Sequence, residues 1–179
     1  AQLRNEDFRG PDVFVVLGAS NQLRKSWVVW QEHQGPDVVI ELLSEKTAKQ
    51  DKGKKKQIYQ DQLKVAEYFW FDPWNTDDWA GFQLVDGQYC EIAIDAHQRF
   101  LSQQLGLTLV RWQGVHQGYA RTWLRWATLE GKLLPTAEEL AEAAQQQAEA
   151  ECVARQAAEQ QAEAERVARQ QETVARQAA

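Results

Sequence analysis

The chain has 179 residues, of which 44% are apolar and 26% charged, and its formal net charge is −6. Residues 136–179 contain nine Glu against four Arg, whereas all eight Trp, four Tyr and six Phe lie in residues 1–135. This aromatic content excludes a wholly disordered chain. Strong net basicity is absent, so any nucleic-acid site must be local.

Several other classes of protein are excluded by what the chain lacks. Cys90 and Cys152 belong to no CxxC motif and the three His are far apart, so neither a disulfide scaffold nor a zinc site is expected. No apolar run reaches the roughly 18–20 residues of a membrane span, and no signal peptide is visible. We therefore predict a reduced, cytoplasmic protein. Because the chain has no Met, we also expect a segment to precede Ala1.

Short runs rich in β-branched residues open the chain. Pro11–Leu17, Ser26–Trp30 and Pro36–Leu43 each read as a buried strand, and two of them begin with Pro-Asp. Three such runs within about 35 residues predict one sheet. The composition of the chain changes after these runs, since Glu45–Lys56 contains six Lys and no large apolar residue. We interpret Ala48–Leu63 as a basic amphipathic helix.

More strands are predicted after this helix. Glu67–Asp72 is a strand stopped by Pro73, and a polar loop follows. Asp86-Gly87 is a typical hairpin turn. Leu107–Trp112 reads as a last or edge strand, and an amphipathic segment comes after it. The polar loop after Pro73 is predicted over Asn75–Ala80, and the two strands of the hairpin over Phe82–Val85 and Tyr89–Ile94. The amphipathic segment after the last strand is Thr122–Trp126. This order predicts a mixed α/β or α+β domain built around one sheet.

The last 44 residues, 136–179, predict one long helix. Thr136 and Glu139 form a capping-box pattern just after Pro135. AEAECVARQ and AEAERVARQ repeat at an offset of 14 residues, which is two heptads, so small and β-branched residues follow two seam positions. These are Ala150, Ala157 and Ala164 on one position, and Val153, Val167 and Val174 on the other. The seam lacks large side chains, so a weak coiled coil or a solvated helix is expected.

Acids stand out in the first predicted strands. Asp37 and Glu41 lie four apart on one strand, so both side chains point to one face, and Glu41 is surrounded by apolar residues. Burying a carboxylate costs several kcal/mol unless it is paired or binds a metal. Together with Asp12 on the neighbouring strand, Glu41 would suit Mg²⁺ or Mn²⁺, and a helix Lys could stabilise charge on a phosphoryl group.

Simpler explanations remain open for the same residues. A strand Glu can be a salt-bridged structural acid, and a Lys-rich segment can be a solvated helix start rather than a phosphate grip. Trp70 and Trp74 are expected to pack at the end of a strand, although exposed aromatic rings could stack on bases.

In order along the chain, PDVVIELLS, DKGKKKQIYQ and VAEYFWFDP resemble the Uma-two family, a branch of the restriction-endonuclease-like PD-(D/E)XK superfamily that is abundant in cyanobacteria. The stretch leading into the C-terminal helix resembles cyanobacterial members as well. The resemblance implies a restriction-endonuclease-like mixed sheet flanked by helices. We expect this nuclease-like core to span residues 1–135 and the helical or coiled-coil tail residues 136–179.

The resemblance also implies a site. Asp12 and Glu41 would bind the metal and Lys55 would be the catalytic lysine. Leu43 stands where the superfamily has its usual Lys, so a helix Lys must substitute. The family's N-terminal helical segment, with a further Glu, is largely absent from this chain. Additional candidates are Asp37, Asp51 and Tyr59, and Lys52, Lys54 and Lys56 for phosphate.

The expected function is Mg²⁺- or Mn²⁺-dependent hydrolysis of DNA phosphodiester bonds. The alternative is a catalytically inactive protein of the same fold that acts in nucleic-acid binding or in assembly through its helical tail. A homo-oligomer could form through the core or through the tail.

Overall fold

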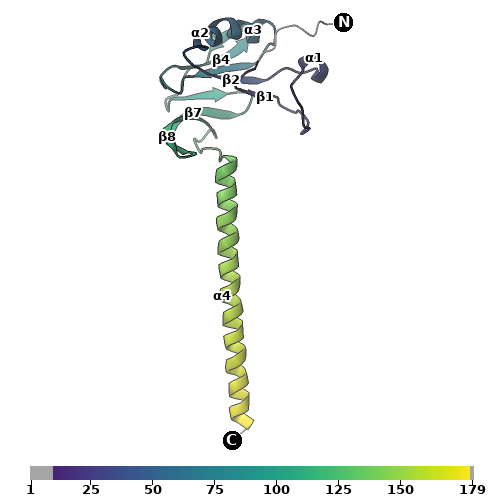
Figure 1. Ribbon diagram of the computed structural model, residues 1–179, viewed down its shortest axis with the longest axis vertical. Coiled ribbons are helices and arrows are strands. Elements are labelled where there is room, and N and C mark those ends of the chain that lie inside the picture. The colour runs from purple at the N-terminus through teal and green to yellow at the C-terminus, as the bar shows by residue number, and fades with distance from the viewer. Residues whose placement is uncertain (1–9, 178–179) are drawn as a thin grey trace. The chain divides into compact units, whose positions relative to one another are not determined.

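A computed structural model describes residues 10–177, except for the side-chain surroundings of residues 172–175 and 177. The chain divides into two compact units, residues 1–134 and 135–179. The first unit is mixed α+β, with a five-stranded and a three-stranded sheet, and the second is one helix (Figure 1). The predicted restriction-endonuclease-like fold class with a long C-terminal helix is confirmed, but the strands form two sheets rather than the one that their order predicted.

The five-stranded sheet has the order β1-β2-β3-β4-β5. Only β2 and β3 are parallel, and the helical segment connects them, as a parallel crossover requires. The strands are β1 (Val13–Val15), β2 (Val38–Leu42), β3 (Glu67–Phe71), β4 (Trp79–Val85) and β5 (Gln88–Glu91). The segment between β2 and β3 consists of α2 (Ala48–Gln50), the π-helical turn η1 (Asp51–Lys55) and α3 (Lys56–Asp61).

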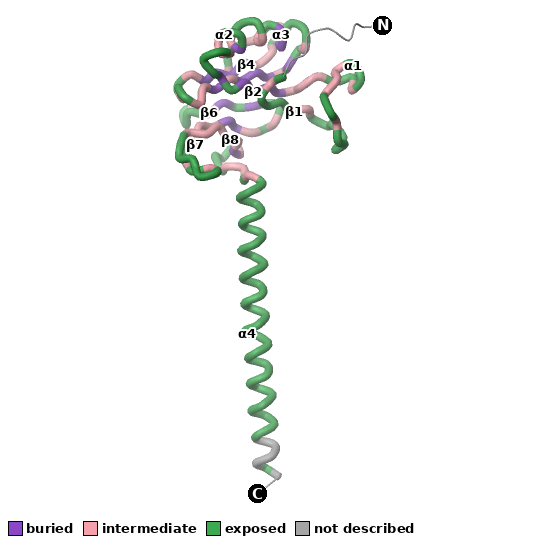
Figure 2. Tube along the Cα trace, in the orientation of Figure 1, coloured by how far each residue is buried: buried purple, intermediate pink, exposed green. Residues whose placement is uncertain are grey.

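Both faces of this sheet are buried, which explains why β2 and β3 are almost continuously apolar. Alternate residues such as Val39 and Tyr68 face the helical segment, where they pack with Tyr59. The intervening residues, such as Ile40 and Phe69, face the second sheet. Burial is therefore concentrated between the layers (Figure 2).

The second sheet is a set of three antiparallel strands in the order β6-β7-β8. They are β6 (Arg99–Ser102), β7 (Leu107–His116) and β8 (Tyr119–Ala127). Phe100 and Leu109 pack on the large sheet, so the face opposite the helices is covered by strands. β7 was expected as a last or edge strand, but it is the middle one. The predicted amphipathic segment Thr122–Trp126 belongs to β8, whose alternating side chains pair across to β7.

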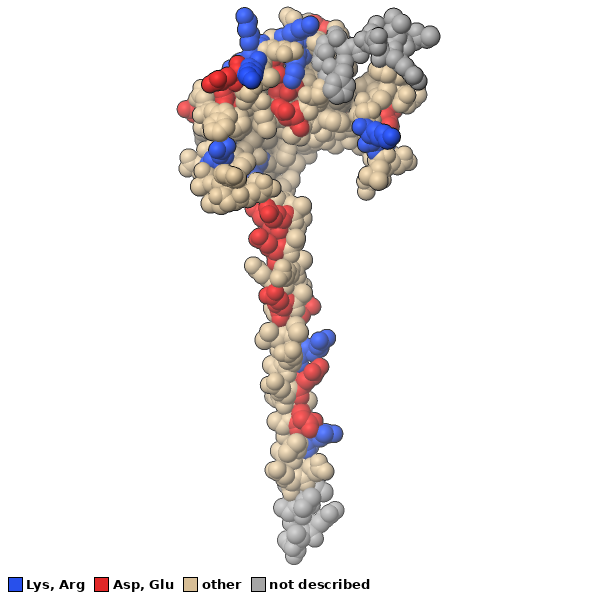
Figure 3. All heavy atoms as spheres, in the orientation of Figure 1, with Lys and Arg blue, Asp and Glu red and all other residues tan. Residues whose placement is uncertain are grey.

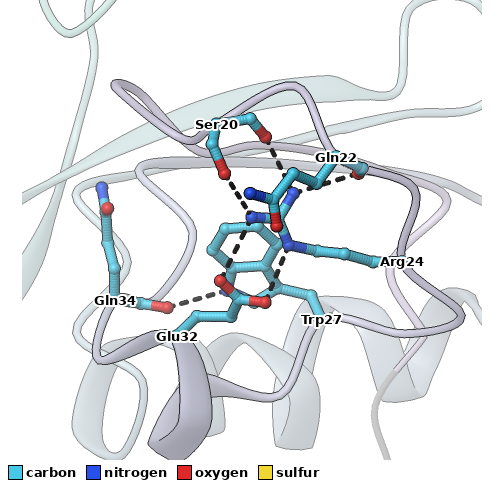
Figure 4. Close-up of polar contacts among 6 residues, drawn as sticks. All are labelled: Ser20, Gln22, Arg24, Trp27, Glu32 and Gln34. Atoms are coloured by element: carbon cyan, nitrogen blue, oxygen red, sulfur yellow. Dashed lines mark hydrogen bonds and ion pairs between the residues drawn. The ribbon is translucent and has the colours of Figure 1, made fainter.

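The prediction of a strand over Ser26–Trp30 is wrong. Val29–Glu32 forms the short helix α1, and the loop around it is organised by Arg24 (Figure 4). Arg24 donates to Glu32 (2.7 Å) and its guanidinium lies 5.0 Å from the ring centre of Trp27. The indole of Trp27 in turn donates to the carbonyl of Gln34 (2.8 Å). These contacts override the β propensity of the run.

The start of β4 was also misplaced, because the strand begins at Trp79 rather than after the expected loop Asn75–Ala80. The hairpin at Asp86-Gly87 is present, with φ angles of 50° and 82° at the two turn residues. Positive φ at both positions is the geometry that favours Asp-Gly in two-residue hairpins.

Glu67 is a buried acid that joins the two sheets. Its carboxylate accepts hydrogen bonds from the Ser102 hydroxyl and from the backbone N–H groups of Gln103 (2.6 Å) and Gln104 (3.1 Å). We predict that Glu67→Ala lowers the free energy of unfolding by about 2–4 kcal/mol, because buried donors lose their acceptor. Urea denaturation measures this, with the exposed Glu45→Gln as control. A loss no larger than that of the control would contradict the prediction.

The second unit is the helix α4 (Ala137–Gln177). The predicted capping box forms, since Thr136 N–H donates to Glu139 (2.7 Å) and Glu139 N–H donates to the Thr136 hydroxyl (3.1 Å). Every described side chain of α4 is exposed, including Val153 and Val167 on the predicted seam (Figure 2). The side chain of Val174 lies outside the described residues. No helix in the described part of the chain could span a membrane.

The exposure of α4 leads to a prediction for a shortened chain. We expect the chain ended after Leu134 to unfold in urea at the same midpoint as the full chain, because α4 buries none of its described side chains. Circular dichroism at 222 nm would show less helix but an unchanged midpoint. A large drop in the midpoint would contradict this prediction and show that residues 135–179 stabilise the rest of the chain.

Candidate active site

Glu41 is a buried acid on the helix-covered face of β2, with an exposed fraction of 1%. Its Oε1 accepts a hydrogen bond from the Tyr59 hydroxyl (2.6 Å), and its Oε2 accepts one from the Lys55 ammonium (3.1 Å). These two contacts offset the cost of removing the carboxylate from water. They explain how an acid can occupy a strand that is otherwise apolar.

The partners of Glu41 come from one side of the helical segment. Asp51, Lys55 and Tyr59 are spaced four residues apart, so they follow one another along one helix face. Lys55 Nζ lies 2.8 Å from Oδ1 of Asp51, an ion pair rather than an aligned hydrogen bond. Asp51 is also 1% exposed, and its Oδ2 has no hydrogen-bond partner within the described residues. Lys55 therefore forms ion pairs with two buried acids, Glu41 and Asp51.

This cluster has more negative than positive charge. Burial raises the pKa of Glu41, and this effect outweighs the hydrogen bonds from Tyr59 and Lys55 that lower it. Burial alone would lower the pKa of Lys55, but the contacts with Asp51 and Glu41 raise it above its ordinary value. Lys55 is thus an ammonium at neutral pH. The cluster thus brings two carboxyl groups to one ammonium.

Asp12 immediately precedes β1, the strand that pairs with β2. The antiparallel register pairs Val13 with Ile40, which is the residue before Glu41. Oδ2 of Asp12 accepts a hydrogen bond from Leu42 N–H (2.7 Å), which ties the carboxylate to β2. Unlike Glu41, Asp12 is exposed to solvent.

The donors of Asp12 and Glu41 fit a hard divalent cation. Both are oxygen donors, Glu41 lies on β2, and the Asp12 carboxylate is hydrogen-bonded to Leu42, the next residue of that strand. Residues 10–177 contain no group of three or more His, Cys, Asp or Glu arranged to hold a metal ion. Mg²⁺ commonly needs only one or two carboxylates, with water and substrate phosphate completing its coordination. The two carboxylates therefore suit an ion whose remaining ligands are water and the phosphate of a substrate.

Asp37 lies apart from this pair. Its Oδ2 accepts a hydrogen bond from Leu17 N–H (2.6 Å), and its own N–H donates to Val15 (2.8 Å). Four residues of strand separate it from Glu41, a distance of about 13 Å. Asp37 therefore fastens the end of β1 to the start of β2.

The three candidate phosphate-binding lysines differ in their surroundings. Lys52 forms an ion pair with Asp78. Lys56 lies 3.3 Å from the ring centre of Phe82, and burial lowers its pKa. Lys54 is exposed. Figure 3 shows Lys and Arg atoms gathered over α2 and α3, the side from which these lysines project. Lys54 is the most accessible of them.

Tyr68 and Asp78 support the site and were not anticipated from the sequence. The buried hydroxyl of Tyr68 donates to the Asp51 carbonyl (2.9 Å), which holds η1 against the sheet, and burial raises the pKa of this hydroxyl. Asp78 accepts from the Trp70 indole (3.3 Å) as well as from Lys52. The spacing of Trp70 and Asp78 matches no recognisable motif, so their contact could not be predicted from the sequence.

Leu43, which stands where a Lys was expected, is buried at 2% exposure and carries no charge to the site. The ammonium next to Glu41 belongs to Lys55 on the helical segment. The additional N-terminal acid implied by the resemblance would fall in or before residues 1–9, which lie outside the described residues.

Comparison with known proteins identifies one family. A family model named Uma2, with the description "Putative restriction endonuclease", matches residues 1–115. The match covers more than half of the chain and includes β1, β2, the helical segment and almost all of β7. No curated protein matches the chain.

Proposed function

The chain belongs to the Uma2 family, and from this membership and the geometry around Glu41 we propose that the protein is a metal-dependent endonuclease that hydrolyses DNA phosphodiester bonds. The observation that carries the proposal is the buried carboxylate of Glu41, which is held by Lys55 and Tyr59. A second carboxylate, that of Asp12, is hydrogen-bonded to the backbone of the next residue of β2, Leu42.

Asp12 and Glu41 would hold Mg²⁺ or Mn²⁺. When bound, such an ion polarises a phosphoryl oxygen and makes a water molecule a better nucleophile at neutral pH. Asp12 is the accessible ligand, and its bond to Leu42 N–H keeps it oriented. Glu41 is the fixed ligand, because Tyr59 and Lys55 restrict both of its oxygens.

Lys55 has two proposed tasks. Its ammonium orients Glu41 and Asp51, and it also supplies a positive charge close to the place where a scissile phosphate would bind. Asp51 keeps Lys55 in position, and Tyr59 does the same for Glu41. Lys54 contributes to phosphate binding from its exposed position, whereas Lys52 and Lys56 do so only if they leave Asp78 and Phe82.

The function is tested by Asp12→Asn in a nicking assay on supercoiled plasmid with Mg²⁺ or Mn²⁺. We expect loss of cleavage by more than about a hundredfold, because a metal ligand is lost and several kcal/mol of transition-state stabilisation go with it. The fold should persist, since the Asn carbonyl can still accept from Leu42 N–H. Asp86→Asn, in the exposed β4–β5 turn, is the matched control.

Two results would contradict the proposal. Cleavage that survives both Asp12→Asn and EDTA would show that another site or a contaminant acts. Absence of cleavage and of any metal-dependent thermal stabilisation in the unmodified protein would favour the inactive, nuclease-fold alternative.

A further inference from the structure

The outer face of the β7–β8 hairpin carries an unusual set of side chains. The register pairs Trp112 with Trp123 and Gly114 with Arg121, so these residues share a face, while Leu109 and its partner Trp126 point to the core. We call this outer face, with one loop residue added, the arginine–tryptophan face. It consists of Trp74, Trp112, Tyr119, Arg121, Trp123 and Arg125.

The aromatic rings of this face are paired with guanidinium groups. Arg121 lies 4.7 Å from the ring centre of Trp74 and 6.0 Å from that of Trp123, and Arg125 lies 5.0 Å from the ring of Trp112. Gly114 makes room for Trp112, since a Cβ at position 114 would lie 2.0 Å from the ring. The sequence therefore accommodates a ring lying along β7.

Two of the aromatic rings are open to solvent. Trp74 is 79% exposed and Tyr119 is 65% exposed. Within the described residues Arg121 has no ion pair, and its guanidinium lies over the two indoles. Exposed aromatic rings are apolar surface that is costly to leave in water, and they are the groups on which nucleic-acid bases stack.

Positive charge on this face comes from Arg121 and Arg125. From Ala96 to Leu129 the sequence contains four Arg and no Asp or Glu. The other two, Arg99 and Arg111, form ion pairs with Asp95 and Asp77, which lie outside that stretch. A protein partner could also cover aromatic rings, but phosphates complement the two arginines of the face, and bases complement its rings.

The loop between β3 and β4 connects this face to the candidate active site. At one end of the loop, Asp78 pairs with Lys52 of η1 and accepts from Trp70. Nearer its start, Trp74 lies against Arg121. The same loop therefore contacts both the arginine–tryptophan face and Lys52, which lies three residues before Lys55. The family match ends at residue 115, before Arg121 and the whole of β8.

We infer that the arginine–tryptophan face binds an unpaired DNA strand, by base stacking on Trp74 and Tyr119 and by phosphate contacts from Arg121. This inference rests on the proposed function in one respect, namely that the bound strand leads into the nuclease site. The substrate class is then DNA with a single-stranded segment next to the cleaved bond, rather than uniform duplex.

The binding test uses the full chain in EDTA, so that it does not depend on cleavage. Fluorescence anisotropy compares a labelled oligothymidine of about 15 nucleotides with a duplex of the same length, a length that covers one typical single-strand site. We expect tighter binding of the single strand. Trp74→Ala should weaken it about tenfold, the effect of losing one base stack, and Arg121→Gln should weaken it by a similar factor through the loss of a phosphate contact.

Matched controls separate this face from general charge and hydrophobicity. Trp30→Ala removes an exposed Trp elsewhere, and Arg166→Gln removes an exposed Arg on α4, so both should bind as the unmodified protein does. Trp74 and Arg121 are themselves exposed, so their variants are expected to fold, and circular dichroism verifies it. Equal weakening by the controls, equal affinity for duplex, or no single-strand binding at low salt would overturn the inference.

A cleavage comparison distinguishes this inference from the proposed function. With Mg²⁺, forked DNA should be cut faster than blunt duplex, and Trp74→Ala should remove that preference while slow duplex cleavage persists. Metal-dependent cleavage without any preference for the fork would overturn the inference and leave the proposed function standing. Trp74-dependent single-strand binding without cleavage of any DNA would leave the binding face standing and refute the nuclease.

Discussion

Glu41→Gln is expected to abolish metal-dependent DNA cleavage while leaving the protein at least as stable as the unmodified chain at neutral pH. The amide cannot supply the negative charge that a divalent cation needs, so activity should fall by more than about a hundredfold. The amide can keep both existing contacts, since its oxygen can accept from Lys55 and its NH₂ can donate to the Tyr59 oxygen.

The stability part of this prediction follows from the pKa of Glu41. Burial raises that pKa in the folded state. A carboxyl with a raised pKa contributes stability at low pH, and this contribution is lost as pH rises through the folded-state pKa. Gln does not titrate, so the variant should lack this loss and its free energy of unfolding should depend less on pH above the ordinary Glu range.

Urea denaturation at several pH values and the plasmid assay check both parts, with the exposed Glu91→Gln as control. A variant that is inactive because it is unfolded would contradict the stability part. A stable variant that still cuts DNA would remove Glu41 from the metal site.

The sequence predicted several elements well because their patterns are local. β2 and β3 are continuous apolar runs, the Asp86-Gly87 turn sets its own hairpin, and Thr136 with Glu139 caps α4. Each of these signals depends on residues a few positions apart. The SWVVW run failed for the opposite reason, because Arg24 and Glu32, outside the run, decide its conformation.

For the candidate site, too, the features set by local sequence could be predicted and those set by long-range contacts could not. Asp51, Lys55 and Tyr59 share a helix face, which their spacing predicts. The position of Glu41 within an apolar run can likewise be read directly from the sequence. The contact of Asp12 with Leu42, next to Glu41, joins residues 30 positions apart, and the Asp78 contact with Lys52 joins residues 26 positions apart. No local pattern contains such information. For Asp37, the even spacing shows that its side chain shares a face with Glu41 but does not show how close the two carboxylates lie.

Lys55→Met is expected to be the most destabilising single change at the site. It keeps most of the apolar stem of the side chain but removes the only ammonium that contacts Glu41 and Asp51 within the described residues. Removing one partner of a buried ion pair costs about 3–5 kcal/mol, because the remaining charges stay buried without compensation. Cleavage should be lost as well, since the charge near the scissile phosphate disappears.

The pH dependence identifies the cause of this destabilisation. Without Lys55, the pKa of Glu41 should rise further, because the lysine's hydrogen bond and charge both lower it in the unmodified protein. The folded variant therefore takes up a proton more readily than the unfolded chain, so its stability improves on acidification. Urea denaturation should show a smaller deficit at about pH 5 than at about pH 8. The exposed neighbour Lys54→Met should show neither the deficit nor its pH dependence. A deficit of equal size at both pH values would mean that Lys55 acts through packing, and that the two carboxylates do not depend on its charge.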